Sequence, residues 1–153
     1  MDDERARSRV DAASLRVPFR DVDMHGHVHN AVYLSYCESA INEYLREHDL
    51  SRYFAPDEAG IVYLVRKTEL VFNRPSRFED RLSFTLAITK LGSASIAFSV
   101  DVVGEGETTP RVAATIVWVC VDAGQRSSTA IPARTRDALT PLVAGPPSAP
   151  GQR

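Results

Sequence analysis

The sequence lacks the features that mark several large functional classes. Its longest apolar run, ATIVWVCV, is too short to span a bilayer, which needs about 20 residues. There is no dense Lys/Arg block and the formal net charge is -2, which argues against nucleic acid or an anionic membrane as the main partner. The first residues, MDDERARSRVDAAS, mix charges without an apolar core, so we expect neither a secretory signal nor a membrane anchor.

Cysteine is also scarce. Only Cys37 and Cys120 occur, and neither has a second cysteine close by, so no zinc-finger spacing exists. One disulfide between them is possible. Two buried free thiols in a reducing cytoplasm are the favoured interpretation, and we expect a cytoplasmic protein.

The remaining composition is that of one ordinary globular domain. The chain has 153 residues, of which 44% are hydrophobic and 25% charged. No repeat, low-complexity block or linker divides it. We expect a single domain over 14–142, with flexible tails at 1–13 and 143–153, because the first is charged and aperiodic and the last is rich in Pro and Gly.

Hydrophobic spacing predicts one long helix. Asn30 is a suitable N-cap, and from there to His48 apolar residues recur at three- and four-residue steps. Before it, residues 15–20 suggest a first strand, and Pro18 within that run suits an edge position. The stripe consists of Val32, Tyr33, Tyr36, Cys37, Ala40, Ile41, Tyr44, Leu45 and His48.

Four strand-like runs follow the helix, at 61–72, 83–89, 95–102 and 111–121. Gly92-Ser93 marks a hairpin turn between the second and third, and a short helix is expected between Pro132 and Pro141. The sum is an α+β layout in which a mostly antiparallel five-stranded sheet wraps one long helix. The other face of such a sheet needs cover, so we expect at least a dimer.

The most informative segment is RDVDMHGHVHNAVYLSYCESAINEY, residues 20–44. It places two aspartates, three histidines and a glycine directly before the helix. The first turn of a helix carries free N–H groups and a partial positive charge. Reactive side chains beside it can act on a carbonyl that those N–H groups polarise. The segment therefore indicates a catalytic or binding site.

Its first part, RDVDMHGHVHNAVYLSYCESA, resembles the signature of hotdog-fold thioesterases of the 4-hydroxybenzoyl-CoA thioesterase-like group. In that group an Asp-x-Asp, a Gly-His-Val and an Asn precede the Tyr-Leu-x-Tyr start of the central helix. The resemblance continues through VFNRPSRFEDRLSF, LGSASIAFSVDVVGEGE, RVAATIVWVCVD and IPARTRDAL, which is nearly the whole chain. It implies a hotdog fold and hydrolysis of an acyl thioester, most often of coenzyme A, without cofactor or metal.

Asp23 matches the catalytic aspartate of that group, which attacks the carbonyl directly or activates a water. The backbone N–H groups of Asn30, Ala31 and Val32 are expected to point toward the thioester oxygen. Either aspartate alone would more simply be a turn or capping residue. Within the full pattern we favour catalysis for Asp23 and the turn role for Asp21.

Glu38 lies two turns into the helix, where other branches of the fold carry their catalytic carboxylate. A solvated helix glutamate is an equal alternative. If both Asp23 and Glu38 face one site, the less solvated carboxylate would have the higher pKa. The sequence leaves open which of them is the base.

The histidines are weaker candidates. His27 occupies the position of the Gly-His-Val histidine and could orient Asp23 or a water, or hydrogen-bond the turn, which we favour slightly. His25 and His29 depart from the commoner pattern. A metal site is disfavoured, because the histidines alternate residue by residue in a turn and the group needs no metal.

Substrate-binding residues follow only by position in the resemblance. The pantetheine arm is expected to run between subunits, near Gly92, with Lys90, Ser93 and Arg126 as candidate contacts. The simpler interpretation of each is a solvent-facing turn residue. We therefore expect a homo-oligomer, a dimer or a tetramer.

Three functions remain open at this stage. The leading hypothesis is an acyl-CoA thioesterase. The alternatives are an acyl-carrier-protein thioesterase of fatty-acid or polyketide synthesis, and a non-catalytic acyl-CoA-binding module. A hotdog dehydratase is disfavoured because the acid–base Asp and His of those enzymes are arranged differently. Fold alone does not decide among these reactions.

Overall fold

The computed structural model of the chain describes residues 10–56 and 59–144. Most of the tails expected at 1–13 and 143–153 lies outside the described residues. None of the helices within the described part is both long and apolar enough to cross a membrane.

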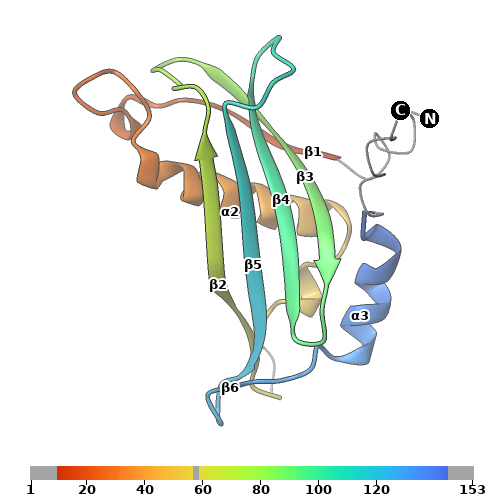
Figure 1. Cartoon of the computed structure of the whole chain (residues 1–153). Helices are drawn as coiled ribbons and strands as arrows, with labels where there is room; N and C mark the ends of the chain where they lie inside the picture. Colours follow the sequence, from red (N-terminus) through yellow and green to blue (C-terminus); the bar gives the residue numbers. More distant parts are fainter. Residues whose placement is uncertain (1–9, 57–58, 145–153) are drawn as a thin grey trace, which may run out of the picture.

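One antiparallel sheet forms the body of the molecule (Figure 1). Five long strands lie in the spatial order β1-β3-β4-β5-β2, and a short strand, β6, pairs with β5. The predicted α+β fold with a five-stranded antiparallel sheet is thus confirmed, with β6 as an addition. The strands are β1 (Val10–Arg16), β2 (Ile61–Phe72), β3 (Arg81–Leu91), β4 (Ser95–Gly104), β5 (Val112–Asp122) and β6 (Ser127–Ser128).

Helix α2 (Asn30–Glu47) crosses one face of this sheet and is wrapped by it (Figure 1). The predicted helix and the turn at Gly92-Ser93 are both confirmed. So is the short C-terminal helix, α3 (Ala133–Leu139), which packs beside the β3–β4 turn, where Arg136 donates to the Gly92 carbonyl oxygen at 2.6 Å. Three short 3₁₀ helices complete the described fold: η1 (Phe19–Asp21), η2 (Ser51–Tyr53) and η3 (Thr140–Leu142).

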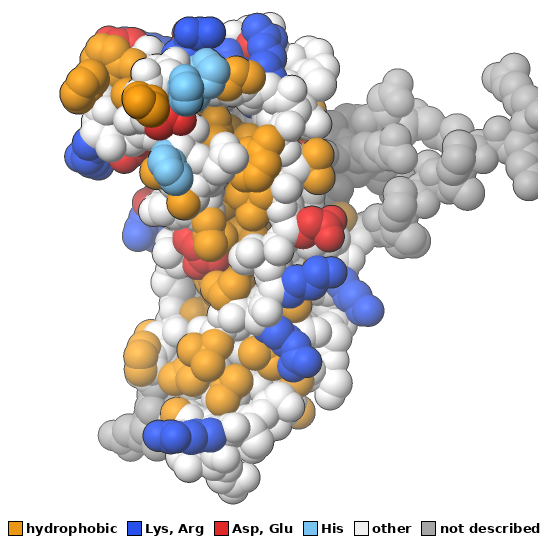
Figure 2. Space-filling model, turned by 60° about the vertical axis from the view of Figure 1, so that its left-hand side comes forward, with side chains coloured by type: hydrophobic (Ala, Val, Ile, Leu, Met, Phe, Trp, Pro, Cys, Tyr) orange, Lys and Arg blue, Asp and Glu red, His pale blue; other side chains and the backbone are white. Residues whose placement is uncertain are grey.

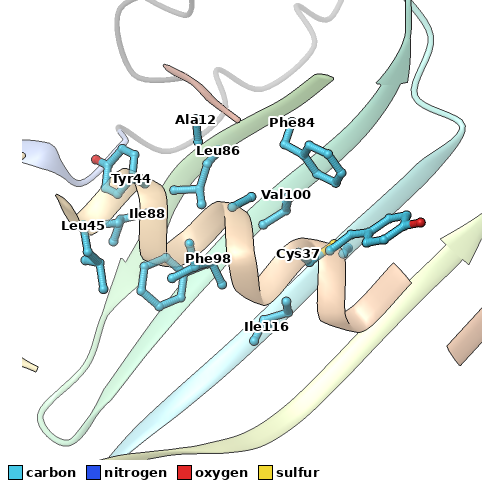
Figure 3. Close-up of a cluster of buried hydrophobic side chains, with 14 of the residues drawn as sticks. Ala12, Cys37, Tyr44, Leu45, Phe84, Leu86, Ile88, Phe98, Val100 and Ile116 are labelled. Carbon is cyan, nitrogen blue, oxygen red and sulfur yellow. The ribbon is translucent and has the colours of Figure 1, made fainter. Parts of the chain in front are cut away.

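The core lies between α2 and the sheet (Figure 3). The helix contributes the stripe expected from its spacing, including Cys37, Tyr44 and Leu45. Strand β4 contributes every second residue, since buried positions alternate strictly along it. Burial of these apolar residues between the two elements holds the helix on this face of the sheet. Both cysteines are buried and free, as the sequence indicated.

The first strand was placed wrongly by the sequence. It spans Val10–Arg16 and pairs with β3 at the sheet edge, whereas residues 15–20 were expected. The chain leaves the sheet at Pro18, which precedes η1 as its N-cap residue. Proline has no N–H to donate to a ladder, so the strand ends there instead of continuing through it.

The helix cap is also one residue earlier than expected. His29, with an extended ψ of 133°, is the N-cap, and its Nδ1 accepts from the Ala31 N–H at 3.3 Å. Asn30 is already helical. An imidazole nitrogen thus fills the role usually taken by an Asn, Asp or Ser side chain.

Substitutions at buried and at exposed strand positions should differ in their effect on the free energy of unfolding. Phe98 is fully buried against Trp118, with ring centroids 5.0 Å apart. We expect Phe98→Ala to lower the free energy of unfolding by about 3–5 kcal/mol. The exposed Thr115→Ala should change it by no more than about 0.5 kcal/mol. Urea denaturation at one fixed protein concentration measures both, and equal midpoints would contradict this account of the core.

Candidate active site

The segment before α2 folds into a small hairpin. Val22 and Val28 form an isolated antiparallel bridge, and the Asp23 N–H donates to the His27 carbonyl oxygen at 2.8 Å. The Gly26 N–H donates back to the Asp23 carbonyl oxygen at 3.0 Å. Gly26 has a φ of +76°, a conformation that a residue without Cβ adopts at no steric cost. The hairpin presents the Asp23 side chain from a tight, hydrogen-bonded turn.

The two oxygens of the Asp23 carboxylate are used differently. Oδ1 accepts from the backbone N–H groups of His25 at 2.8 Å and His27 at 3.2 Å. Desolvation raises the pKa of Asp23, but these N–H groups and the two nearby imidazoles outweigh it and hold the pKa below its ordinary value. Within the described residues, Oδ2 has no hydrogen bond. Asp23 is therefore an ionised carboxylate with one oxygen free to react.

The start of α2 supplies one free backbone donor. The Ala31 N–H is taken by the His29 side chain, and the Val32 N–H donates to the His29 carbonyl oxygen at 2.9 Å. The Asn30 N–H has no acceptor in the described part of the chain. Of the three N–H groups that the sequence suggested as oxyanion donors, the one on Asn30 is left available.

A cavity of about 290 Å³ brings these groups together. Asp23, His27 and Asn30 all line it, so the structure unites three of the four side chains proposed for catalysis. A carboxylate oxygen and a free N–H beside one cavity can act on the two ends of a bound carbonyl. The remaining walls are Val28, Tyr33, Phe72, Asn73, Arg74 and Pro75.

The far wall of the cavity comes from the end of β2 and the turn after it. The Phe72 ring packs against Tyr33, with centroids 5.8 Å apart. The N–H groups of Asn73 and Arg74 both donate to the Arg111 carbonyl oxygen, at 2.8 and 3.1 Å. The sequence did not indicate Phe72, Asn73 or Arg74 as residues of the site. The run NRP marks a turn, but nothing in it shows that the turn faces the helix start.

Arg111 anchors this wall from behind. Its guanidinium donates to both Glu107 carboxylate oxygens at 2.8 Å and to Asp80 at 2.6 Å. Arg74 pairs with the same Glu107 at 3.1 Å. The half-buried network joins the β2–β3 connection to the β4–β5 turn. It holds Asn73 and Arg74 in place beside the cavity.

Glu38 lies apart from this group and does not line the cavity. Its Oε1 accepts from the Trp118 indole N–H at 3.4 Å, on strand β5. Burial raises the pKa of Glu38 above its ordinary value, and the Trp118 hydrogen bond partly opposes that rise. The side chain is half-buried, at the edge of the helix face that packs on the sheet.

The three candidate substrate contacts also lie elsewhere. Lys90, Ser93 and Arg126 are exposed and do not line the cavity. The β3–β4 and β5–β6 turns lie at the end of the sheet opposite the hairpin that precedes α2 (Figure 1). One chain therefore does not bring these residues to Asp23.

Known proteins that are similar to this chain in sequence and in structure include thioesterases. Residues 17–139 match the model of the thioesterase-like superfamily. The chain is 31% identical over 118 residues to the acyl-CoA thioester hydrolase YbgC of Escherichia coli O6:H1, covering 77% of this chain and 87% of that protein. It is 26% identical over 129 residues to the long-chain acyl-CoA thioesterase FadM of Escherichia coli K12, covering 84% and 96%. The crystal structure of YbaW, a probable thioesterase from Escherichia coli, matches with a TM-score of 0.76 at 25% identity, covering 88% and 99%.

The contrast between the two carboxylates can be measured directly. We expect Asp23 to titrate below its ordinary value of 3.8 and Glu38 above its ordinary value of 4.5. Trp118→Phe removes the indole N–H that donates to Glu38, so it should raise the Glu38 pKa further and leave the pKa of Asp23 unchanged. Carboxyl-detected NMR titration of the wild type and this variant checks both. An Asp23 midpoint above 3.8 would show that the hairpin N–H groups do not hold its charged form.

Proposed function

The chain belongs to the thioesterase-like superfamily, and we propose that it hydrolyses acyl-CoA thioesters to the free acid and coenzyme A. The observation that carries the proposal is the shared cavity of Asp23 and Asn30, an ionised carboxylate beside a free helix N–H. The acyl-CoA hydrolases YbgC and FadM among its relatives support coenzyme A as the carrier.

The proposed reaction uses both groups on one carbonyl. The thioester oxygen accepts from the Asn30 N–H, at the positive end of the α2 dipole, which stabilises the negative charge that develops on it. Oδ2 of Asp23 either attacks the carbonyl carbon or takes a proton from the water that does so. In the direct route the carbon–sulfur bond breaks, coenzyme A leaves as its thiolate, and a water then hydrolyses the acyl–Asp23 anhydride to the free acid, one of its protons passing to the thiolate. In the water route the proton that Asp23 takes from the water passes to the thiolate as the carbon–sulfur bond breaks. Since the Asp23 pKa is lowered, the carboxylate stays ionised throughout the neutral range.

His27 and Glu38 take secondary roles in this proposal. The backbone N–H of His27 donates to Oδ1 of Asp23. His27 also lines the cavity, where its imidazole can orient a water. Glu38 is bonded to Trp118 and does not reach the cavity of its own chain. We assign the base or nucleophile to Asp23 for that reason.

We further propose that the protein acts in the cytoplasm as a homodimer or homotetramer joined along β2. This strand is an edge of the sheet, with apolar side chains exposed on it. Figure 2 shows hydrophobic side chains gathered down this side of the molecule below the histidines. Because β2 ends at the cavity wall, a partner there would lie beside the site and could supply Lys90, Ser93 or Arg126 to the coenzyme A. The exposed residues are Leu64, Val65, Val71 and Phe72.

The catalytic assignment is tested by paired isosteric changes. We expect Asp23→Asn to lower kcat for acyl-CoA hydrolysis by about 10²- to 10⁴-fold, because the amide can neither attack nor accept a proton. Glu38→Gln should keep most of the activity. Release of free thiol from a panel of acyl-CoAs measures both variants against the wild type.

Other outcomes discriminate the remaining hypotheses. Full activity of Asp23→Asn with loss in Glu38→Gln would move the chemistry to the other carboxylate. Faster turnover of matched acyl-carrier-protein thioesters would change the carrier. Tight binding of acyl-CoA without any turnover would identify a binding module instead of an enzyme.

The proposed assembly has its own test. Leu64 is 52% exposed on β2, so Leu64→Glu should shift the protein toward monomer through an unpaired charge on an apolar contact surface. Thr108→Glu, in the exposed β4–β5 turn, should leave the mass unchanged. Light scattering coupled to size exclusion measures the mass. A wild type that is already monomeric would refute the assembly.

A further inference from the structure

Asp21, two residues before Asp23, has a side-chain contact of its own. Its Oδ2 accepts from the Tyr36 hydroxyl at 2.6 Å, across 15 residues of sequence. Its carbonyl oxygen accepts from the N–H of His29, the helix cap, at 2.9 Å. The base of the Asp23 hairpin is therefore tied to α2 at two points, its first turn and its second.

Tyr36 is a rigid anchor for this contact. It is 8% exposed, and its ring stands edge-on to those of Tyr33, at a centroid distance of 6.1 Å, and Phe84, at 6.2 Å. Tyr33 in turn lines the cavity and Phe84 belongs to strand β3. Burial, together with the hydrogen bond to Asp21 and its charge, raises the pKa of Tyr36, so the hydroxyl stays protonated and remains a donor at neutral pH.

The opposite side of the hairpin is fixed to a different element. The Val28 N–H donates to the Ser76 carbonyl oxygen at 2.8 Å, and His27 bridges to Arg77. These bonds tie the hairpin to the β2–β3 connection. The chain itself joins the hairpin to the first turn of α2 through His29, and the Tyr36–Asp21 hydrogen bond adds a tie to the second turn. Asp23 lies on the hairpin and Asn30 opens the helix, so this tie restricts how far the two can move apart.

We infer that Tyr36 and Asp21 are positioning residues, whose hydrogen bond sets Asp23 at the working distance from the N–H groups that open α2. The inference rests on the proposed thioester hydrolysis at Asp23. Neither residue lines the cavity of Asp23, and Tyr36 faces a separate cavity of about 650 Å³ between β1 and α2. Loss of the bond frees the hairpin to shift, and a shift of about 1 Å between reacting groups can cost a factor of about 100 in rate.

The test removes one hydroxyl at a time from α2. Tyr36→Phe keeps the ring and should lower kcat for acyl-CoA hydrolysis by about 10- to 100-fold, with KM changed by less than about three-fold. Tyr44→Phe is the matched control, because Tyr44 is another buried tyrosine of the same helix, 2% exposed and in its second half. Tyr44→Phe should keep kcat within about two-fold of the wild type even if its Tm falls as far as that of Tyr36→Phe.

Asp21 gives a second route to the same contact. Asp21→Ala should lower kcat as Tyr36→Phe does, and Asp21→Asn, which keeps an acceptor oxygen, should restore part of it. The double variant Asp21→Ala/Tyr36→Phe should be no slower than the slower single variant, since both changes break one bond. If Tyr36→Phe does not fold, the two Asp21 variants decide the question.

Three results would overturn the inference: full kcat in folded Tyr36→Phe or Asp21→Ala, an equal loss in Tyr44→Phe, or multiplying losses in the double variant. Failure of the proposed function looks different. In that case the wild type releases no thiol from acyl-CoA and the positioning variants have no rate to lower, or Asp23→Asn is fully active.

Discussion

Burial of one face of α2 against the concave sheet is the constraint on which the rest of the structure depends. Tyr33, Cys37 and Ile41 fill that face, and the alternating apolar positions of β3, β4 and β5 meet them. Once the helix lies there, its first turn must open beside the end of β2, where Phe72 packs on Tyr33. The cavity is a consequence of this packing, since its walls come from both elements.

The two carboxylates near the helix show how the environment separates groups of one chemical type. Asp23 receives backbone N–H groups and has its pKa lowered, while burial beside Trp118 raises the pKa of Glu38. A turn rich in N–H donors stabilises a charge that a half-buried helix position disfavours. The hairpin can therefore carry an ionised carboxylate into a cavity lined by Tyr33, Phe72 and Val28.

Most of the fold was predictable because its elements have strong local patterns. The strand at Ile61–Phe72 has the bounds that its spacing indicated, and the helix at Asn30–Glu47 differs from its prediction by one residue at each end. The errors fall where a particular contact outweighs the general residue preference. Residues 15–20 resembled a strand, but β1 pairs earlier with β3 and stops before Pro18. His29 caps the helix although Asn30 has the higher propensity, because its imidazole reaches the Ala31 N–H.

The sequence by itself determined the helix, the order of the strands along the chain, and the proximity of Asp23, His27 and Asn30, since these residues are neighbours in one short segment. Only the tertiary structure decided what surrounds them. It places Phe72, Asn73 and Arg74 at the cavity. It also forms the hydrogen bonds from Trp118 to Glu38 and from Tyr36 to Asp21. The physical reason is that periodicity and turn chemistry act over a few residues, whereas these contacts depend on the curvature of the sheet around the helix.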